Sequence, residues 1–196
     1  MQIEGGKEGD IICVPTSFQS KQLIISEGLT LGDLERHPHI DIAIDGADEI
    51  DVKSLDCIKG GGGCQTLEKL VAYNANMLLI VADHTKESRI LGSKWRKGIP
   101  VEVLPSAYIV VSKALRQMGG DPTLRLCTGG KAGPVVTDNG NFIVDVIFGE
   151  MTAEKVRELN REIKMVPGVV EHGLFVGMAK RAFLGQEDGS VRVIEL

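Results

Sequence analysis

Four consecutive glycines, Gly60 to Gly63, constrain the fold of this chain more than any other feature. Inside a regular element each glycine is destabilising by about 0.5–1 kcal/mol relative to alanine, so the run predicts a loop. An apolar stretch at 55–58 precedes it, and a helical pattern at 65–74 follows it. The loop therefore joins a strand to a helix start, where backbone N–H groups can face an anion or an oxyanion. It matches neither the Walker phosphate loop nor the dinucleotide-binding pattern.

Charged residues flank this loop, which makes the alternative of a simple hinge the weaker one. Lys59 directly precedes the glycines, and Glu68 lies in the first turns of the predicted helix. Asp45 and Asp48 follow a short apolar strand at 41–44. A partly desolvated Glu has the raised pKa of a general base, and paired aspartates can bind sugar hydroxyls and relay protons. Taken singly, each carboxylate also fits a turn or a helix cap.

Three other polar features carry weaker signals. The hydroxyl-rich turn at 16–20 can bind phosphate or cap the helix that follows it. The basic segment 94–97, around the single Trp, is either solvated surface or a phosphate contact. Glu49 is expected to face solvent.

Strand and helix patterns alternate along the first half of the chain. The expected strands are 11–14, 41–44, 55–58 and 77–81, and the expected helices are 18–27 and 65–74. These strands are mainly apolar and do not alternate between apolar and polar residues, so they predict an α/β fold with a mostly parallel, Rossmann-like sheet covered by helices on both faces. Ligands bind such sheets beyond the carboxyl ends of the strands, where Asp45 and Lys59 fall.

From Pro100 onward the order of elements changes. We expect a strand at 101–104, a helix at 107–118, strands at 124–127 and 141–146, a helix at 152–163 and a strand at 169–175. This βαββαβ order predicts a second, smaller ferredoxin-like α+β domain. The tail strands, near 182–184 and 191–194, return to the first sheet. The predicted domains are 1–103 with 177–196, and 104–176.

Composition narrows the class of protein. The chain has 196 residues, 43% of them hydrophobic, which suffices for one large or two small cores. Its net charge of −5, without a basic run, argues against nucleic acid and against an anionic membrane surface. No apolar run reaches membrane-spanning length, and the N-terminus has no apolar signal core. The four cysteines lack CxxC spacing, so we expect no zinc, reduced thiols and a cytoplasmic location.

Several collinear motifs together resemble ribose-5-phosphate isomerase type A, most closely its eukaryotic branch. The motifs are DGADEI at 45–50, IKGGGG at 58–63 followed by Glu68-Lys69, GIPVEV at 98–103, GPVVTDNGN at 133–141, PGVV at 167–170 and GLF at 173–175. The resemblance covers nearly the whole chain from about Ile11. It implies an aldose–ketose isomerase of the non-oxidative pentose phosphate pathway, with neither cofactor nor metal. Such an enzyme interconverts D-ribose 5-phosphate and D-ribulose 5-phosphate as a homodimer or homotetramer.

The resemblance also implies roles for individual residues. Glu68 is the base that moves a proton between C2 and C1 through an enediolate, while Lys59 steadies the developing oxyanion. Asp45 and Asp48 bind sugar hydroxyls, and one of them assists ring opening. The other implied substrate contacts are Gly46, Ala47, Gly60, Gly61, Gly62 and, near the family's lysine, Lys97 in preference to Arg96.

One departure from the family pattern affects these expectations. Family members begin with a strand, a phosphate loop resembling Thr-Gly-Ser-Thr and a helix, ahead of the segment that starts here near Ile11. Without that loop we expect weak substrate affinity, reduced stability or both. An alternative is a catalytically impaired, truncated variant that associates with full-length subunits. A third hypothesis, acyl transfer with Glu68 as nucleophile, has no coenzyme A site to support it.

Overall fold

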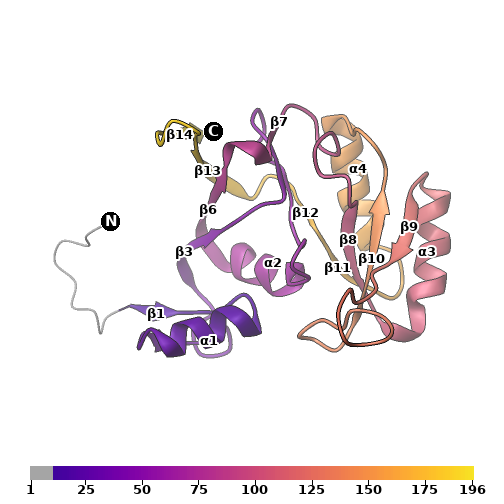
Figure 1. Ribbon diagram of the computed structural model, residues 1–196, viewed down its shortest axis with the longest axis horizontal. Helices are drawn as coiled ribbons and strands as arrows, with labels where there is room; N and C mark the ends of the chain where they lie inside the picture. The colour runs from indigo at the N-terminus through magenta and orange to yellow at the C-terminus, as the bar shows by residue number, and fades with distance from the viewer. Residues whose placement is uncertain (1–10) are drawn as a thin grey trace.

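The computed structural model describes residues 11–196 (Figure 1). These residues form three four-stranded sheets and one parallel pair of strands. The helices are α1 (Phe18–Ser26), α2 (Gln65–Asn74), α3 (Tyr108–Gln117) and α4 (Ala153–Lys164). Short 3₁₀ turns occupy His84–Lys86 and Pro105–Ala107. The mixed α/β architecture confirms the predicted fold class.

The first sheet has the order β14-β13-β6-β3. Its strands are β3 (Ile40–Asp45), β6 (Ala75–Asp83), β13 (Ala179–Gly185) and β14 (Val191–Glu195). The pairs β3–β6 and β6–β13 are parallel, whereas the terminal hairpin β13–β14 is antiparallel. The tail therefore returns to the first sheet, as the sequence predicted. Helix α2 packs against β3 and β6, over a core that includes Ala43, Leu78 and Ile80.

The prediction that helices cover both faces of this sheet is wrong for the described residues. The face opposite α2 carries Ile42, Ile44, Val81 and Val193, each more than half exposed. The first predicted strand also differs from expectation: among the described strands β1 (Ile12–Cys13) pairs with β2 (Thr30–Leu31) alone, and Ile12 is 45% exposed. The apolar sequences of β1 and of this sheet face predict burial, but in residues 11–196 these side chains stay about half exposed.

The second sheet has the order β11-β8-β10-β9 and is antiparallel throughout. Its strands are β8 (Ile99–Val103), β9 (Asp121–Leu124), β10 (Phe142–Ile147) and β11 (Val169–His172). When these four strands are numbered by their order along the chain, their order across the sheet is fourth, first, third, second, which is the arrangement of a split βαβ unit. Helices α3 and α4 contribute to the core of this sheet: Leu115 of α3 and Leu159 of α4 belong to the same buried cluster as Val101 of β8. Figure 1 shows both helices beside this sheet, apart from the first sheet.

Two strand predictions in this unit need correction. The strand expected at 124–127 is β9 (Asp121–Leu124), which includes Pro122. Proline is tolerated there because, within residues 11–196, β9 is an edge strand with β10 as its one neighbour. The strand expected at 169–175 is divided at Gly173 into β11 and β12 (Leu174–Phe175), which belong to different sheets.

The third sheet has the order β12-β5-β4-β7. Along the chain, its strands connect the first sheet to the antiparallel sheet. It contains β4 (Glu49–Asp51), β5 (Cys57–Ile58) and β7 (Glu87–Ser88) as well as β12. At its junction with the antiparallel sheet, the Lys59 N–H donates to the Gly173 carbonyl at 2.8 Å. A Cβ on Gly173 would lie 2.1 Å from the Lys59 carbonyl oxygen, so only glycine fits there. The domain limits at 103/104 and 176/177 stay a prediction. The first limit assigns β8, which ends at Val103, to the Rossmann-like domain, although β8 pairs within the antiparallel sheet.

Candidate active site

Lys59 lies at the centre of a buried cluster that it forms with Asp45 and Glu68, here named the Lys59 cluster. Its Nζ is 2.9 Å from Asp45 Oδ2 and 3.1 Å from Glu68 Oε2. It also donates to the Gly46 carbonyl. The Lys59 side chain is 3% exposed and that of Glu68 14%, so both ion pairs are largely shielded from water. Three of the four side chains singled out from the sequence are therefore brought together.

Three different elements deliver these side chains to one point. Asp45 is the last residue of β3, and Lys59 follows the end of β5. Glu68 stands in the first turn of α2, which begins after the glycine loop. The backbone of Lys59 is fixed by the hydrogen bond to Gly173, so the lysine has little freedom to leave the cluster.

The electrostatics of the cluster suit proton transfer. Burial raises the pKa of Glu68, and the nearby Lys59 charge offsets this only in part. Burial alone would lower the pKa of Lys59, but the carboxylates of Glu68 and Asp45 outweigh it and raise that pKa. Lys59 therefore keeps its charge, beside a carboxyl group whose proton affinity is increased.

Asp48 holds the glycine loop instead of joining the Lys59 cluster directly. Its Oδ2 accepts the Gly61 N–H at 2.7 Å, and a Cβ on Gly61 would lie 2.5 Å from Oδ1. Burial raises the pKa of Asp48, and the charges of Lys59 and Arg125 partly offset that effect. Gly60 and Gly63 have φ of +97° and +83°, which favours glycine at both positions.

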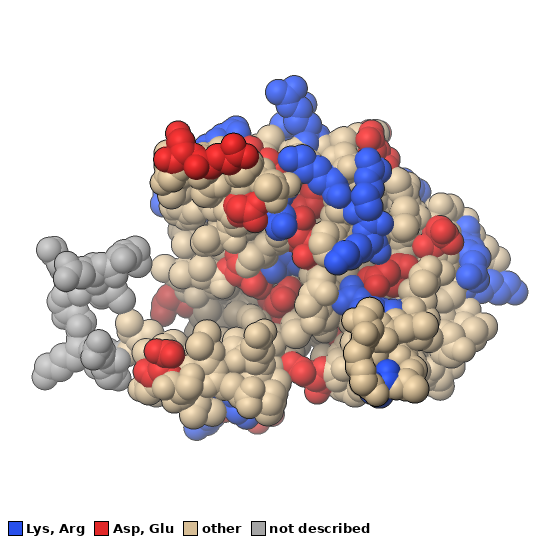
Figure 2. All heavy atoms as spheres, in the orientation of Figure 1, with Lys and Arg blue, Asp and Glu red and all other residues tan. Residues whose placement is uncertain are grey.

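A cavity of about 300 Å³ reaches the Lys59 cluster along the edge of β3. Asp45, Glu68 and Thr16 line it, together with apolar side chains that include Val71 and Leu78. Figure 2 shows a hollow between α1 and the body of the molecule, with acidic side chains at its rim. A few polar groups converging in a largely apolar cavity are typical of a small-molecule site.

The hydroxyl turn before α1 has separate tasks. Ser17 and Ser20 form a reciprocal capping box, in which the Ser20 N–H donates to Ser17 Oγ at 2.9 Å. These two residues therefore serve the helix, as the capping interpretation predicts. Thr16 is the member of the turn that lines the cavity.

The basic segment lies apart from the Lys59 cluster. Lys97 Nζ sits 5.1 Å from the centroid of the Trp95 ring, and Arg96 Nη1 is 3.5 Å from the Gly92 carbonyl. Within residues 11–196 neither side chain forms an ion pair with Asp45 or Glu68. A substrate contact for Lys97 stays a prediction.

The expectation that Glu49 faces solvent is wrong. Its side chain is fully buried, because β4 pairs with β5 on one edge and β7 on the other. The two carboxylate oxygens accept the backbone N–H groups of Gly92, Ser93, Lys94 and Trp95 and the Ser93 hydroxyl, at 3.0–3.2 Å. Glu49 thus anchors the basic segment to the strand that follows Asp48.

A second ionic group, named here the Lys69 cluster and buried except for Lys164, was not predicted from the sequence. It contains Lys69, Lys164, Glu171 and His172. Lys69 Nζ is 2.9 Å from Glu171 Oε1 and donates to the His172 carbonyl at 2.6 Å, while Lys164 Nζ is 2.7 Å from Glu171 Oε2. The cluster ties α2 to α4 and β11 and so fixes the helix that carries Glu68.

Two further polar contacts join the elements around the glycine loop. Arg125 donates to the carbonyls of Gly60 and Gly61 and forms a bidentate ion pair with Asp145. Glu102, fully buried in β8, accepts hydrogen bonds from Thr66 of α2 and from Thr137, Asn139 and Asn141. No spacing in the sequence reveals these long-range pairs. A lone Arg in a strand pattern carries no signal of its partner.

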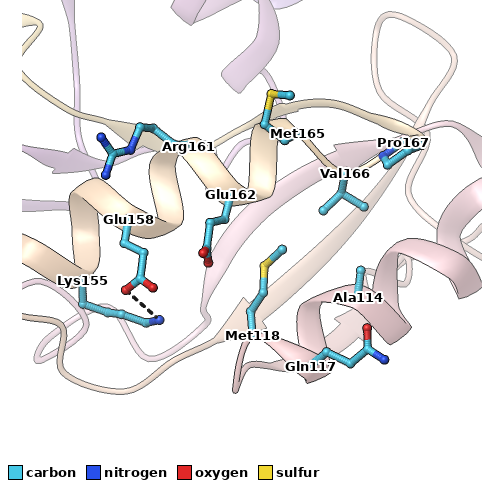
Figure 3. A pocket seen from close by; sticks show the side chains of 10 residues that line it. All are labelled: Ala114, Gln117, Met118, Lys155, Glu158, Arg161, Glu162, Met165, Val166 and Pro167. Atoms are coloured by element: carbon cyan, nitrogen blue, oxygen red, sulfur yellow. Dashed lines mark hydrogen bonds and ion pairs between the residues drawn. The ribbon is translucent and has the colours of Figure 1, made fainter.

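A larger groove, of about 730 Å³, lies between α3 and α4 (Figure 3). Met118, Met165 and Val166 form its apolar part, and its charged side chains include the Lys155–Glu158 ion pair at 3.1 Å. No carboxylate there is buried against a lysine, so the groove lacks the proton-transfer chemistry of the Lys59 cluster. Within residues 11–196, no group of three or more His, Cys, Asp or Glu side chains is arranged to hold a metal ion. None of the helices in that range has the length and apolar character needed to cross a membrane.

Comparisons with known proteins point to one family. The family model described as ribose 5-phosphate isomerase A (phosphoriboisomerase A) matches residues 12–189. A ribose-5-phosphate isomerase of Dictyostelium discoideum is 57% identical over 186 residues, which are 94% of this chain and 79% of that protein. One of Sus scrofa is 55% identical over 187 residues, which are 95% of this chain. The chain spans 60% of the length of the Sus scrofa relative.

A solved structure supports the same assignment. It is described as a D-ribose-5-phosphate isomerase in complex with phospho-erythronic acid, and it is 35% identical to this chain with a TM-score of 0.89. The match covers 95% of this chain and 79% of that one. Sequence and three-dimensional arrangement therefore agree.

Proposed function

The chain belongs to the ribose 5-phosphate isomerase A family, and we propose that it interconverts D-ribose 5-phosphate and D-ribulose 5-phosphate. The observation that carries this proposal is the Lys59 cluster, in which a buried lysine lies within 3.1 Å of two carboxylates at the mouth of a cavity. The phospho-erythronic acid bound by a structural relative supports a sugar phosphate as the substrate class.

Glu68 is the base in the proposed reaction. In the open-chain aldose the C2 proton is acidic because it lies next to the C1 carbonyl. Glu68 removes that proton, the electron pair forms the C1–C2 double bond, and O1 becomes an oxyanion. Return of the proton to C1 and transfer of the O2 hydroxyl proton to O1 give the ketose. The raised pKa of Glu68 suits both proton transfers.

Lys59 and the glycine loop stabilise the negative charge that develops on oxygen. A buried cation and aligned backbone N–H groups are most effective where water is excluded. Lys59 meets this condition because its side chain is 3% exposed. Asp45, at the edge of the cavity, is placed to accept hydrogen bonds from sugar hydroxyls. Asp48 supports the loop through Gly61, and the further substrate contacts are Gly46, Ala47 and Lys97.

The proposal also covers the location, the domain division and the oligomeric state of the enzyme. We place it in the cytoplasm, where reduced thiols are maintained, because Cys13, Cys57, Cys64 and Cys127 are all unpaired. The division into a Rossmann-like and a ferredoxin-like domain and assembly as a homodimer or homotetramer are part of this proposal. The intact Lys59 cluster favours catalysis over a non-catalytic role as a partner of longer subunits.

The test is isomerisation of ribose 5-phosphate by the purified 196-residue chain in deuterium oxide, followed by nuclear magnetic resonance. Proton transfer through an enediolate predicts deuterium at C1 of the ketose product. Turnover without any deuterium would contradict a solvent-exchanging base and favour hydride transfer. A chain that is folded by circular dichroism yet gives no turnover would contradict the proposed activity.

A further inference from the structure

We infer that Arg125, held by Asp145, is a positioning residue that orients the glycine loop toward the reacting oxygen. The inference rests on the proposed function, because it assigns the loop N–H groups to the oxyanion of the isomerisation. Arg125 follows β9, in the antiparallel sheet, whereas the loop precedes α2. The residue therefore joins two units that the chain separates by more than sixty positions.

The guanidinium of Arg125 uses its donors on two sides. Nε and Nη2 donate to the two oxygens of Asp145 at 2.7 and 2.6 Å. Nη1 donates to the carbonyls of Gly60 and Gly61, each at 3.1 Å. The side chains of Arg125 and Asp145 are only 16% and 17% exposed, so the pair is well shielded. A bidentate Arg–carboxylate pair fixes the plane of the guanidinium, and with it the direction of Nη1.

The backbone around Arg125 is equally constrained. Its N–H donates to the Ile143 carbonyl at 2.8 Å, and its carbonyl accepts the Val135 N–H at 2.9 Å. Ile143 also meets the loop, because a Cβ on Gly63 would lie 3.0 Å from Ile143 Cδ1. Arg125 is therefore a fixed support for the loop and not a mobile surface side chain.

The peptide planes show how this support reaches the reacting site. In a trans peptide the carbonyl of one residue and the N–H of the next point in opposite directions. The described residues contain no cis peptide bond. When Arg125 holds the Gly60 carbonyl, the Gly61 N–H points the other way, where it meets Asp48 at 2.7 Å.

The same geometry applies to the next peptide. Arg125 holds the Gly61 carbonyl, so the Gly62 N–H points away from the guanidinium. Among residues 11–196 this N–H has no protein acceptor, and a Cβ on Gly62 would meet no atom within 4 Å. An unpaired N–H beside open space is the donor that an oxyanion requires. The positive charge on the carbonyl side also polarises this peptide and strengthens the donor.

A merely structural role for Arg125 predicts different results from a positioning role. If Arg125 only joined the two units, its loss would lower stability and leave the catalytic parameters of the folded protein unchanged. If it supplied only charge, lysine would replace it. Lysine cannot form the bidentate pair with Asp145 while it donates to two carbonyls in fixed directions. The positioning role therefore predicts that Arg125→Lys fails to restore kcat.

The experiment compares Arg125→Met, Arg125→Lys and the milder Asp145→Asn with the matched control Arg181→Met. Arg181 also pairs with a carboxylate, Glu195 at 2.6 Å, but it lies on the terminal hairpin. Amide hydrogen exchange of Gly61 and Gly62 is measured in the free proteins, and kcat and KM are measured with ribose 5-phosphate. For Arg125→Met we expect at least tenfold faster exchange at Gly61 and a kcat lower by about 10- to 100-fold. The KM of Arg125→Met changes less than about threefold. In Arg181→Met the exchange rates, kcat and KM stay at their wild-type values.

Each outcome decides a separate question. Unchanged exchange in Arg125→Met, or a kcat within threefold of wild type in Arg125→Lys, overturns the inference. If Arg125→Met does not fold, Asp145→Asn carries the same test, with a smaller loss of kcat. If the wild-type chain gives no turnover, the proposed function fails, while the exchange data alone still show whether Arg125 orients the loop.

Discussion

Two buried lysines face the same aromatic ring but have opposite electrostatic settings. Lys59 Nζ lies 5.3 Å and Lys69 Nζ 4.9 Å from the centroid of the Phe175 ring. Their side chains are 3% and 14% exposed. Burial and the shared ring are thus similar for the two residues, so the difference must come from the charges around them.

The number of carboxylates per lysine decides the direction of each pKa shift. Lys59 has Asp45 and Glu68 as partners, and together they raise its pKa despite burial. Among the described residues Lys69 has Glu171 as its one carboxylate partner and shares it with Lys164, so burial prevails and lowers the pKa of Lys69 to about 8. A buried lysine keeps its charge most firmly where the local balance is negative.

The pKa values of the carboxylates beside the two lysines also shift in opposite directions. Glu68 has a raised pKa, which makes it a proton acceptor of useful strength. Burial alone would raise the pKa of Glu171, but Lys69 and Lys164 outweigh it and lower that pKa to about 2. Burial lowers the pKa of His172 to about 3, so the ring stays neutral at physiological pH. One cluster is therefore suited to proton transfer and the other to structural support. Three experiments test this difference, and a fourth tests a buried side chain outside both clusters.

The largest effect is expected from Glu68→Gln, which removes the proposed base but keeps the shape of the side chain. General-base catalysis contributes about 10²- to 10⁴-fold, so we expect kcat to fall roughly 10³-fold. The matched change in the other cluster, Glu171→Gln, should lower thermal stability and change kcat by less than about threefold. Equal losses of kcat in the two variants would abolish the proposed distinction.

The next largest effect is expected from Lys59→Met. Loss of the cation should lower kcat about 100-fold, since it removes charge stabilisation at the oxyanion. Because the Lys59 charge lowers the pKa of Glu68, its loss should also move the acid limb of the kcat/KM profile to higher pH. Lys69→Met serves as the control, and a shifted acid limb in that variant would contradict the assignment.

A smaller effect concerns acid stability. The unfolded chain takes up a proton at His172 near pH 6.5, but the folded protein does so only near pH 3. The unfolded state therefore binds more protons as the pH falls, and this residue removes about 2 kcal/mol of stability between pH 7 and pH 5. Urea denaturation of His172→Gln at both pH values should show that much less loss. If the stability of His172→Gln fell between pH 7 and pH 5 as much as that of the wild type, this account would be refuted.

The smallest effect is expected at Gln65, a buried side chain that belongs to neither cluster. Its amide nitrogen and oxygen have no hydrogen-bond partner among the described residues. Replacing an unpaired buried amide with an apolar side chain of similar size should raise the free energy of unfolding by about 1 kcal/mol. Gln65→Leu tests this by urea denaturation, with the exposed Gln117→Leu as control. A loss of stability would show that the amide is satisfied in solution.

The local elements were largely predictable because their signals are local. Helix α2 was predicted with its observed bounds, since the glycine run fixes its start. The βαββαβ order was recognisable from the succession of strand and helix patterns after Pro100. The division at Gly173 was not, because it depends on close approach to the Lys59 carbonyl, which is distant in sequence. The burial of Glu49 was missed for the same reason, since its acceptor role depends on a loop more than forty residues away.

The sequence by itself determined which chemical groups are available: a lysine before four glycines, two aspartates at a strand end and a glutamate one turn into a helix. Only the tertiary structure decided how they are used. It placed Glu68 against Lys59, gave Asp48 to the loop and brought Arg125 to the opposite side of that loop. The physical reason is that residue types and local propensities are encoded position by position. Charge pairing, desolvation and peptide orientation arise only when distant segments are packed together.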